Sequence, residues 1–137
     1  MLGKNVKIDL LKQAPLFAAC SRKELAEAAL IADEIDFAAG DVLIHEGKRG
    51  RQFYAIVEGT VKVTRKGRTV PIRGGADFFG EMALVTDAPT NATVTATSPV
   101  RALVIADHRF KALLAHSPAI QLKVLRSLAE RLAVDSL

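Results

Sequence analysis

A glycine followed by a carboxylate, Gly80-Glu81, stands inside an otherwise apolar stretch of this 137-residue chain. Glycine lets the backbone approach a ligand closely, and the first N–H groups of a helical turn suit a phosphate. The Glu81 carboxylate would repel that phosphate, but it accepts hydrogen bonds, and a sugar hydroxyl is a suitable donor. These residues leave two interpretations: a loop that reads phosphate by backbone and ribose by Glu81, or a glutamate that caps its own turn.

Neutral hydrogen-bonding residues follow in Pro-Thr-Asn-Ala-Thr at 89–93. The amides of Asn91 and Ala92 are candidates to face the same anion, since the small Ala92 side chain permits close approach. The alternative is a polar turn that leads into the next strand. No Lys or Arg stands between Arg73 and Arg101, so this stretch contains no cationic side chain that could bind an anion.

The composition excludes several classes of protein. One cysteine, Cys20, rules out an intrachain disulfide framework and a four-cysteine metal site, and the three histidines stand apart, so we expect no metal. No His or Cys lies between His45 and His108, so we expect no enzyme and no cofactor. The start of the chain does not resemble a signal peptide, and no apolar run reaches membrane-spanning length. We therefore expect a cytoplasmic protein with no membrane contact.

Helical patterns flank a region of short strands, within what we predict to be a single domain over 1–137. Ser21 and Glu24 form a capping-box pattern that predicts a helix over about 22–32. Between 36 and 105, short apolar or alternating runs are separated by glycine, which favours a small β-barrel or sandwich. Asp107 is predicted to cap a helix after 106, and Ser117-Pro118 to begin the last one.

The run Phe-Gly-Glu-Met-Ala-Leu at 79–84, followed by 89–93, resembles the phosphate-binding cassette of the cyclic nucleotide-binding domain family. The resemblance covers about 14–134. It implies a mainly β fold with flanking helices: an eight-stranded jelly-roll β-barrel with N-terminal helices and C-terminal lid helices. It also implies that a ligand lies in the barrel against the cassette, with Glu81 holding the ribose 2′-hydroxyl.

The resemblance assigns further residues by position. The ligand-binding set that it implies is Gly80, Glu81, Met82, Ala83, Thr90, Asn91, Ala92, Val63 and Val94, with Val61 and Phe78 as further walls for the base. The last helix is expected to form a lid through Leu125, Arg126, Leu128 and Leu132, with Arg126 or Arg131 stacking on a purine.

Two departures from the family pattern concern charge. Thr90 stands where the cassette has its phosphate-binding arginine, and that arginine's charge-assisted bond is worth about 1.5–3 kcal/mol. The loop 47–51, Gly-Lys-Arg-Gly-Arg, carries basic residues at two positions that are often acidic in the family. Arg73 or an arginine of the lid is a candidate substitute for the cassette arginine.

Three functions remain open on these residues. The first is a sensor or regulatory module that binds cyclic AMP or cyclic GMP, orders its lid helix and modulates a protein effector. The second is a variant site that binds a nucleoside or another metabolite without using the phosphate. The third is a non-binding scaffold, with homodimerisation through the C-terminal helix. Because the chain ends just past the lid helix, we expect it not to bind DNA itself.

Overall fold

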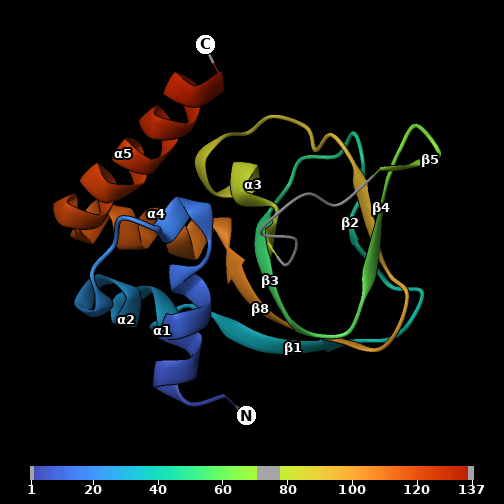
Figure 1. Ribbon diagram of the computed structural model, residues 1–137, viewed down its shortest axis with the longest axis horizontal. Helices are drawn as coiled ribbons and strands as arrows, with labels where there is room; N and C mark the ends of the chain where they lie inside the picture. The colour runs from blue at the N-terminus through green and yellow to red at the C-terminus, as the bar shows by residue number, and fades with distance from the viewer. Residues whose placement is uncertain (1, 71–77, 136–137) are drawn as a thin grey trace.

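The strands pair into two antiparallel sheets of four strands each in the part of the chain that the computed structural model describes (Figure 1). That part comprises residues 2–70 and 78–135, with side chains up to residue 130. One sheet has the order β1-β8-β3-β6 and the other β2-β7-β4-β5. Their bounds are β1 Asp33–Phe37, β2 Val42–Ile44, β3 Gln52–Glu58, β4 Val61–Arg65, β5 Arg68–Val70, β6 Phe78–Phe79, β7 Thr93–Ala96 and β8 Val100–Ala106.

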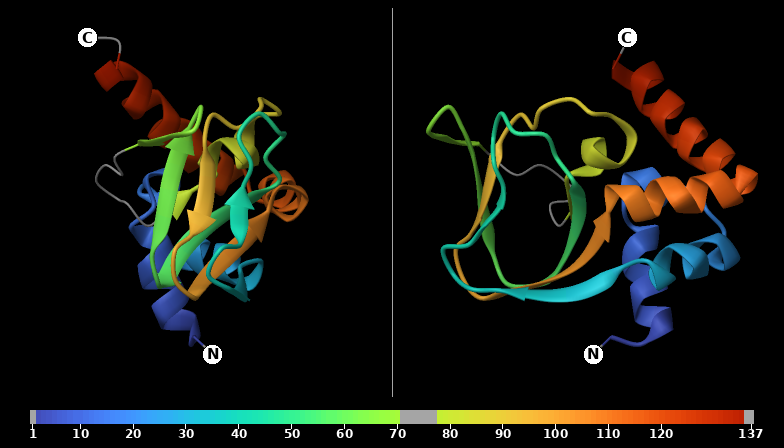
Figure 2. Two further views of the ribbon diagram at one scale, coloured as in Figure 1. Left: turned by 90° about the vertical axis from the view of Figure 1, so that its right-hand side faces the viewer. Right: turned by 180° about the vertical axis from the view of Figure 1, so that it is seen from behind.

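This strand order is that of a jelly roll, which confirms the mainly β fold predicted from the resemblance. The eight described strands form two facing sheets rather than one closed barrel (Figure 2). Except for the β4–β5 hairpin, neighbouring strands in each sheet come from distant parts of the sequence, as in the register that pairs Val63 of β4 with Val94 of β7. The fold therefore carries residues of the middle of the chain to the cassette.

The helices gather on one side of the sandwich, as both figures show (Figures 1 and 2). Their bounds are α1 Lys4–Lys12, the 3₁₀ helix η1 Pro15–Phe17, α2 Arg22–Leu30, α3 Glu81–Val85, α4 Asp107–His116 and α5 Pro118–Asp135. No helix in the described ranges has the length and apolar character needed to cross a membrane.

Two helix starts confirm the capping signals of the sequence. The Ser21 hydroxyl accepts from the Glu24 amide at 3.2 Å, while the Ser21 amide donates to the Glu24 carboxylate at 2.8 Å. At α5 the Ser117 hydroxyl accepts from the Ile120 amide at 3.3 Å, and proline takes the first helical position. The capping role predicted for Asp107 is wrong, because Asp107 is the first residue of α4 and its carboxylate instead pairs with Arg49 at 3.3 Å.

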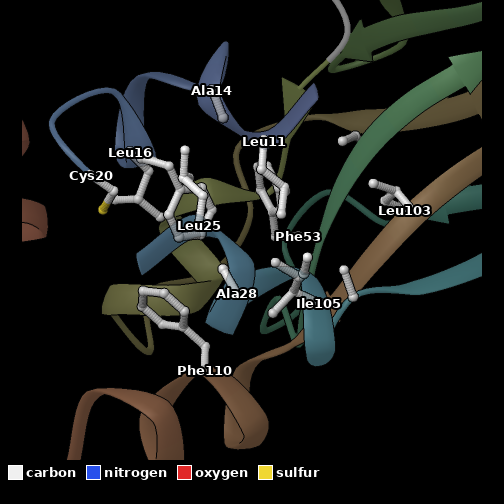
Figure 3. Packing of buried hydrophobic residues seen from close by; sticks show 14 of the residues in the cluster. Leu11, Ala14, Leu16, Cys20, Leu25, Ala28, Phe53, Leu103, Ile105 and Phe110 are labelled. Carbon is white, nitrogen blue, oxygen red and sulfur yellow. The ribbon is translucent and has the colours of Figure 1, made fainter. Parts of the chain in front are cut away.

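Strands β3 and β8 are buried on both faces because each separates two cores. Phe53 of β3 and Ile105 of β8 belong to a cluster shared with the helices, shown in Figure 3. Their chain neighbours Tyr54 and Val104 point between the sheets into a second cluster. Side chains of a strand alternate between faces, so a strand buried on both sides reads as a continuous apolar run. The fully buried Phe17 of η1 packs edge-on against Phe53, with ring centroids 6.1 Å apart.

Candidate functional site

A cavity of about 670 Å³ opens where α3 and the segment after it meet the second sheet. Its volume lies within the range of small-molecule sites, about 300–1,000 Å³. All nine residues predicted to contact a ligand line it: Gly80, Glu81, Met82, Ala83, Thr90, Asn91, Ala92, Val63 and Val94. Phe78 lines it as well, whereas Val61 is not among its walls. The structure thus brings together residues from three separate stretches of the sequence.

Gly80 joins strand β6 to helix α3 in a conformation that favours glycine. Its φ of +84° lies in the left-handed region, and a Cβ added there would come within 2.4 Å of the Gln52 carbonyl oxygen. The predicted short helical turn is present as α3, whose first internal hydrogen bond runs from the Ala83 amide to the Gly80 carbonyl at 3.0 Å. Met82 comes one residue before Ala83, the donor of that bond, and the Met82 side chain is 60% exposed.

The Glu81 carboxylate connects the cavity to the N-terminal region. Its Oε2 accepts a hydrogen bond from the Leu16 amide of η1 at 2.9 Å. This bond joins Glu81 to a residue outside its own helical turn, and the interpretation in which Glu81 caps that turn stays a prediction. Leu16 itself lines the cavity, although nothing in the sequence placed it there. The Glu81 carboxylate therefore links the cavity that it lines to η1, the segment that packs against α5.

Thr90 directs its hydroxyl to the backbone of the β2–β3 loop. The Oγ1 atom lies 3.1 Å from the Lys48 carbonyl oxygen and also donates toward the carbonyl oxygen of His45. Backbone bonds of 2.8 Å run from the Gly47 amide to the Thr90 carbonyl and from the Thr90 amide to the Lys48 carbonyl. At the position of the family's cassette arginine, this chain therefore uses a side chain to join two loops.

Of the basic loop residues, Arg49 is held away from the cavity by carboxylates. Its guanidinium lies 2.8 Å from the Asp87 carboxylate and 3.3 Å from that of Asp107. Lys48, Arg49 and Arg51 all line a second, smaller cavity of about 310 Å³. The two cavities share the walls Ile44, Gly80, Ala83 and Thr90.

An arginine outside the cassette reaches the larger cavity. Arg65, the last residue of β4, lines it and donates from Nε to the Asn91 carbonyl at 2.8 Å. The sequence analysis did not single out this residue. The sequence did contain a signal for Arg65. Val61, Val63 and Arg65 occupy every second position of β4 and so lie on one face, and Val61 and Val63 were predicted to contact the base.

The predicted lid residues divide between the cavity and the solvent. Leu128 lines the cavity and packs against the helical core. Leu125 is 63% exposed and Arg126 is also exposed, and neither is among the cavity walls. The side chains of Leu132 and Arg131, and the whole of Arg73, lie outside the described residues.

The remaining reactive groups lie elsewhere. Cys20 is buried in the helical core, where burial raises the pKa of its thiol above the ordinary value. Within residues 2–70 and 78–130, no three His, Cys, Asp or Glu side chains lie close enough together to hold a metal ion. What the cavity offers is an apolar wall, several amide and hydroxyl groups, one carboxylate and one guanidinium.

Comparison with known proteins places this arrangement among related domains. The profile described as "Cyclic nucleotide-binding domain" matches residues 34–117. A cAMP-dependent protein kinase regulatory subunit of Hypocrea atroviridis is 34% identical over 106 residues, which are 77% of this chain and 23% of that protein. A CRP-like cAMP-activated global transcriptional regulator of Mycobacterium tuberculosis is 30% identical over 129 residues, 90% of this chain and 58% of that protein.

A solved structure gives the same result in three dimensions. The crystal structure of the N-terminal domain of a transcriptional regulator from Streptomyces coelicolor A3(2) superposes with a TM-score of 0.82 at 33% identity, covering 93% of this chain and 94% of that one. The curated relatives are longer than the region they share with this chain, which spans about a quarter of the first and under two thirds of the second.

Proposed function

The chain belongs to the cyclic nucleotide-binding domain family, and we propose that it binds cyclic AMP or cyclic GMP in the cavity beside α3 as a regulatory module. The observation that best supports this proposal is the convergence of the nine predicted contact residues on one cavity of about 670 Å³. A module that served only as a scaffold would have no need of such a cavity.

The lining of the cavity offers groups suited to each part of a cyclic nucleotide. Asn91 and Ala92 contribute backbone groups and a small side chain, which suit the cyclic phosphate. Val63, Phe78 and Val94 provide an apolar wall for the base. Glu81 offers carboxylate oxygens for a ribose hydroxyl, the donor that such an acceptor requires.

We propose that binding is transmitted to α5 through η1. Glu81 bonds to the Leu16 amide of η1, α5 packs against η1, and Leu128 of α5 lines the cavity. A ligand that draws on Glu81 and covers Leu128 would therefore favour one position of α5 over others. Leu122 and Leu125, which are 55% and 63% exposed on α5, are the surface we propose for contact with a second copy of the chain.

Calorimetry with cyclic AMP, cyclic GMP and adenosine tests the proposal directly. We expect heat with at least one cyclic nucleotide and weaker binding of adenosine, which lacks the phosphate. No heat with either cyclic nucleotide at millimolar concentration would refute it, and tighter binding of adenosine would support a nucleoside site. Sedimentation equilibrium of the same samples, with Leu125→Lys as the variant, tests for the second copy.

A further inference from the structure

The cavity contains a guanidinium that the cassette pattern does not supply. Arg65 is the only basic residue among its described walls. It continues the inward face of β4, because Val63 of that face lies directly opposite the buried Val94 and Arg65 follows two positions later. We propose that Arg65 binds the cyclic phosphate in place of the missing cassette arginine, an inference that rests on the proposed function.

The hydrogen bonding of Arg65 fits this role. Its Nε donates to the carbonyl of Asn91, the residue whose amide is predicted to face the phosphate. This bond holds the guanidinium beside that segment, and the two terminal nitrogens make no hydrogen bond with described residues. A guanidinium offers five donors, so those that remain suit a bidentate contact with phosphate oxygens.

The charge of Arg65 is not neutralised by a carboxylate in the described structure. Arg22, Arg49, Arg101 and Arg109 each pair with an aspartate, whereas Arg65 donates to a neutral carbonyl, that of Asn91. An incoming phosphate would not have to displace an existing ion pair. It would therefore keep most of the attraction between its own charge and the guanidinium.

The hairpin that carries Arg65 places a second arginine beside it. Lys66 and Gly67 both have positive φ, as in a two-residue hairpin turn, so Arg65 and Arg68 lie directly opposite each other and on the same face. Like charges in such a pair destabilise the hairpin. A phosphate bound by Arg65 would offset part of the repulsion between Arg65 and Arg68.

The other cations near the cassette are placed differently. Arg49 is paired with Asp87 and Asp107, and Lys48, Arg49 and Arg51 line the smaller cavity rather than the larger one. Arg51 is therefore a matched control: it is an exposed arginine close to the cassette that does not line the proposed ligand cavity.

The test is calorimetry of the full chain with cyclic AMP and adenosine, or with cyclic GMP should that be the ligand bound. We expect Arg65→Gln to weaken cyclic-nucleotide binding by about 10- to 100-fold, the loss typical of a charge-assisted contact, and to leave adenosine binding unchanged. Arg65→Lys, which keeps the charge without the fork, should lose less, and Arg51→Gln should bind as the unchanged chain does. Thermal unfolding of each variant checks that the fold persists.

Equal losses for the nucleotide and the nucleoside, or no loss at all in Arg65→Gln, would overturn the assignment of the phosphate to Arg65. A loss confined to Arg51→Gln would overturn it too and would point to the β2–β3 loop. All three outcomes leave the proposed function standing, because the unchanged chain would still bind the cyclic nucleotide. Absence of binding by the unchanged chain is the separate result that removes the proposed function itself.

Discussion

Single residues decide which atoms a ligand would meet in this cavity. Thr90 uses its hydroxyl to hold the His45 and Lys48 carbonyls and so contributes no charge. Glu81 instead places a carboxylate at the junction between cavity and η1, through its bond with the Leu16 amide. The two side chains differ because a short hydroxyl donates to carbonyl oxygens close to it, whereas a longer carboxylate accepts from more than one donor.

Glu81 is predicted to read the ribose 2′-hydroxyl, and a comparison of two ligands isolates that contact. Glu81→Ala should weaken cyclic AMP binding by about 10- to 150-fold, because a hydrogen bond to a charged group is worth about 1.5–3 kcal/mol. The 2′-deoxy analogue should bind the unchanged chain weakly and show no further loss in the variant. Calorimetry of the unchanged chain and of Glu81→Ala, each with cyclic AMP and with its 2′-deoxy analogue, measures the coupling free energy between Glu81 and the 2′-hydroxyl.

The control for that experiment is Glu81→Gln, which retains an oxygen able to accept from the Leu16 amide. It should unfold at nearly the same temperature as the unchanged chain while losing part of the affinity. If both nucleotides lost affinity equally in Glu81→Ala, the effect would come from the loosened η1 contact rather than from the ribose.

At the scale of secondary structure, the start of helix α2 is joined to helix α5 through one side chain, Glu24. Helix α2 begins with a complete capping box, and Glu24 in its first turn also receives the Lys123 ammonium of α5 at 3.1 Å. The hydrogen bond from the Ser21 amide, followed by the bond and charge of Lys123, lowers the pKa of the Glu24 carboxyl below its ordinary value of 4.5. One ionised side chain thus stabilises both the start of α2 and its contact with α5.

The lowered pKa of Glu24 gives a stability effect with a definite sign. A carboxyl whose pKa is lower in the folded state contributes stability above the unfolded pKa and loses it as the pH falls through the folded pKa. We expect Glu24→Gln, which keeps an oxygen for the Ser21 amide but loses the charge that faces Lys123 and the start of α2, to be less stable than the unchanged chain at pH 7 by about 0.5–1 kcal/mol. The gap should shrink once the pH falls below about 4.5, the ordinary pKa of a glutamate carboxyl.

Urea unfolding of the two proteins at pH 7 and at progressively lower pH measures that gap. Ser21→Ala, which removes the hydroxyl of the box but keeps the Glu24 carboxylate, serves as the comparison. A gap between Glu24→Gln and the unchanged chain that persisted undiminished in acid would contradict the assignment of this stability to the ionised carboxylate.

At the scale of the whole molecule, the jelly roll and the helices meet at the cavity. The second sheet supplies β4 and β7, the first supplies β6, and α3 and Leu128 of α5 close further sides. Figure 2 shows the later part of α5 extending away from the two sheets. A ligand that bridges these parts is expected to couple the position of α5 to occupancy of the site.

Amide hydrogen exchange read by mass spectrometry tests this coupling across the chain. With cyclic nucleotide at about 100 times its dissociation constant, amides of η1 and α5 that exchange through ligand-linked opening should slow by up to about 100-fold. Glu81→Ala at an equally saturating concentration should show a smaller effect in η1 and α5 and an undiminished one at β4. Slowing confined to the strands around the cavity would show that α5 does not respond.

The sequence by itself determined the local features of this protein. The glycine-carboxylate junction, the capping box of α2 and the alternation of β4 depend on neighbours within a few residues, so their patterns are readable along the chain. Residues 79–84 and 89–93 carried the cassette resemblance, and through it the jelly roll and the nine residues that now line one cavity.

Only the tertiary structure decided which distant groups meet. The bond from Leu16 to Glu81 spans 65 positions, and that from Arg65 to Asn91 spans 26. The pairing of β4 with β7 brings Arg65 to the ligand cavity, whereas Arg49, which bridges Pro89 of the cassette, is engaged in ion pairs with Asp87 and Asp107. Long-range register and competition between carboxylates for each cation arise from the packed fold, so a chain that shows no cation within its cassette can still place one at the ligand cavity.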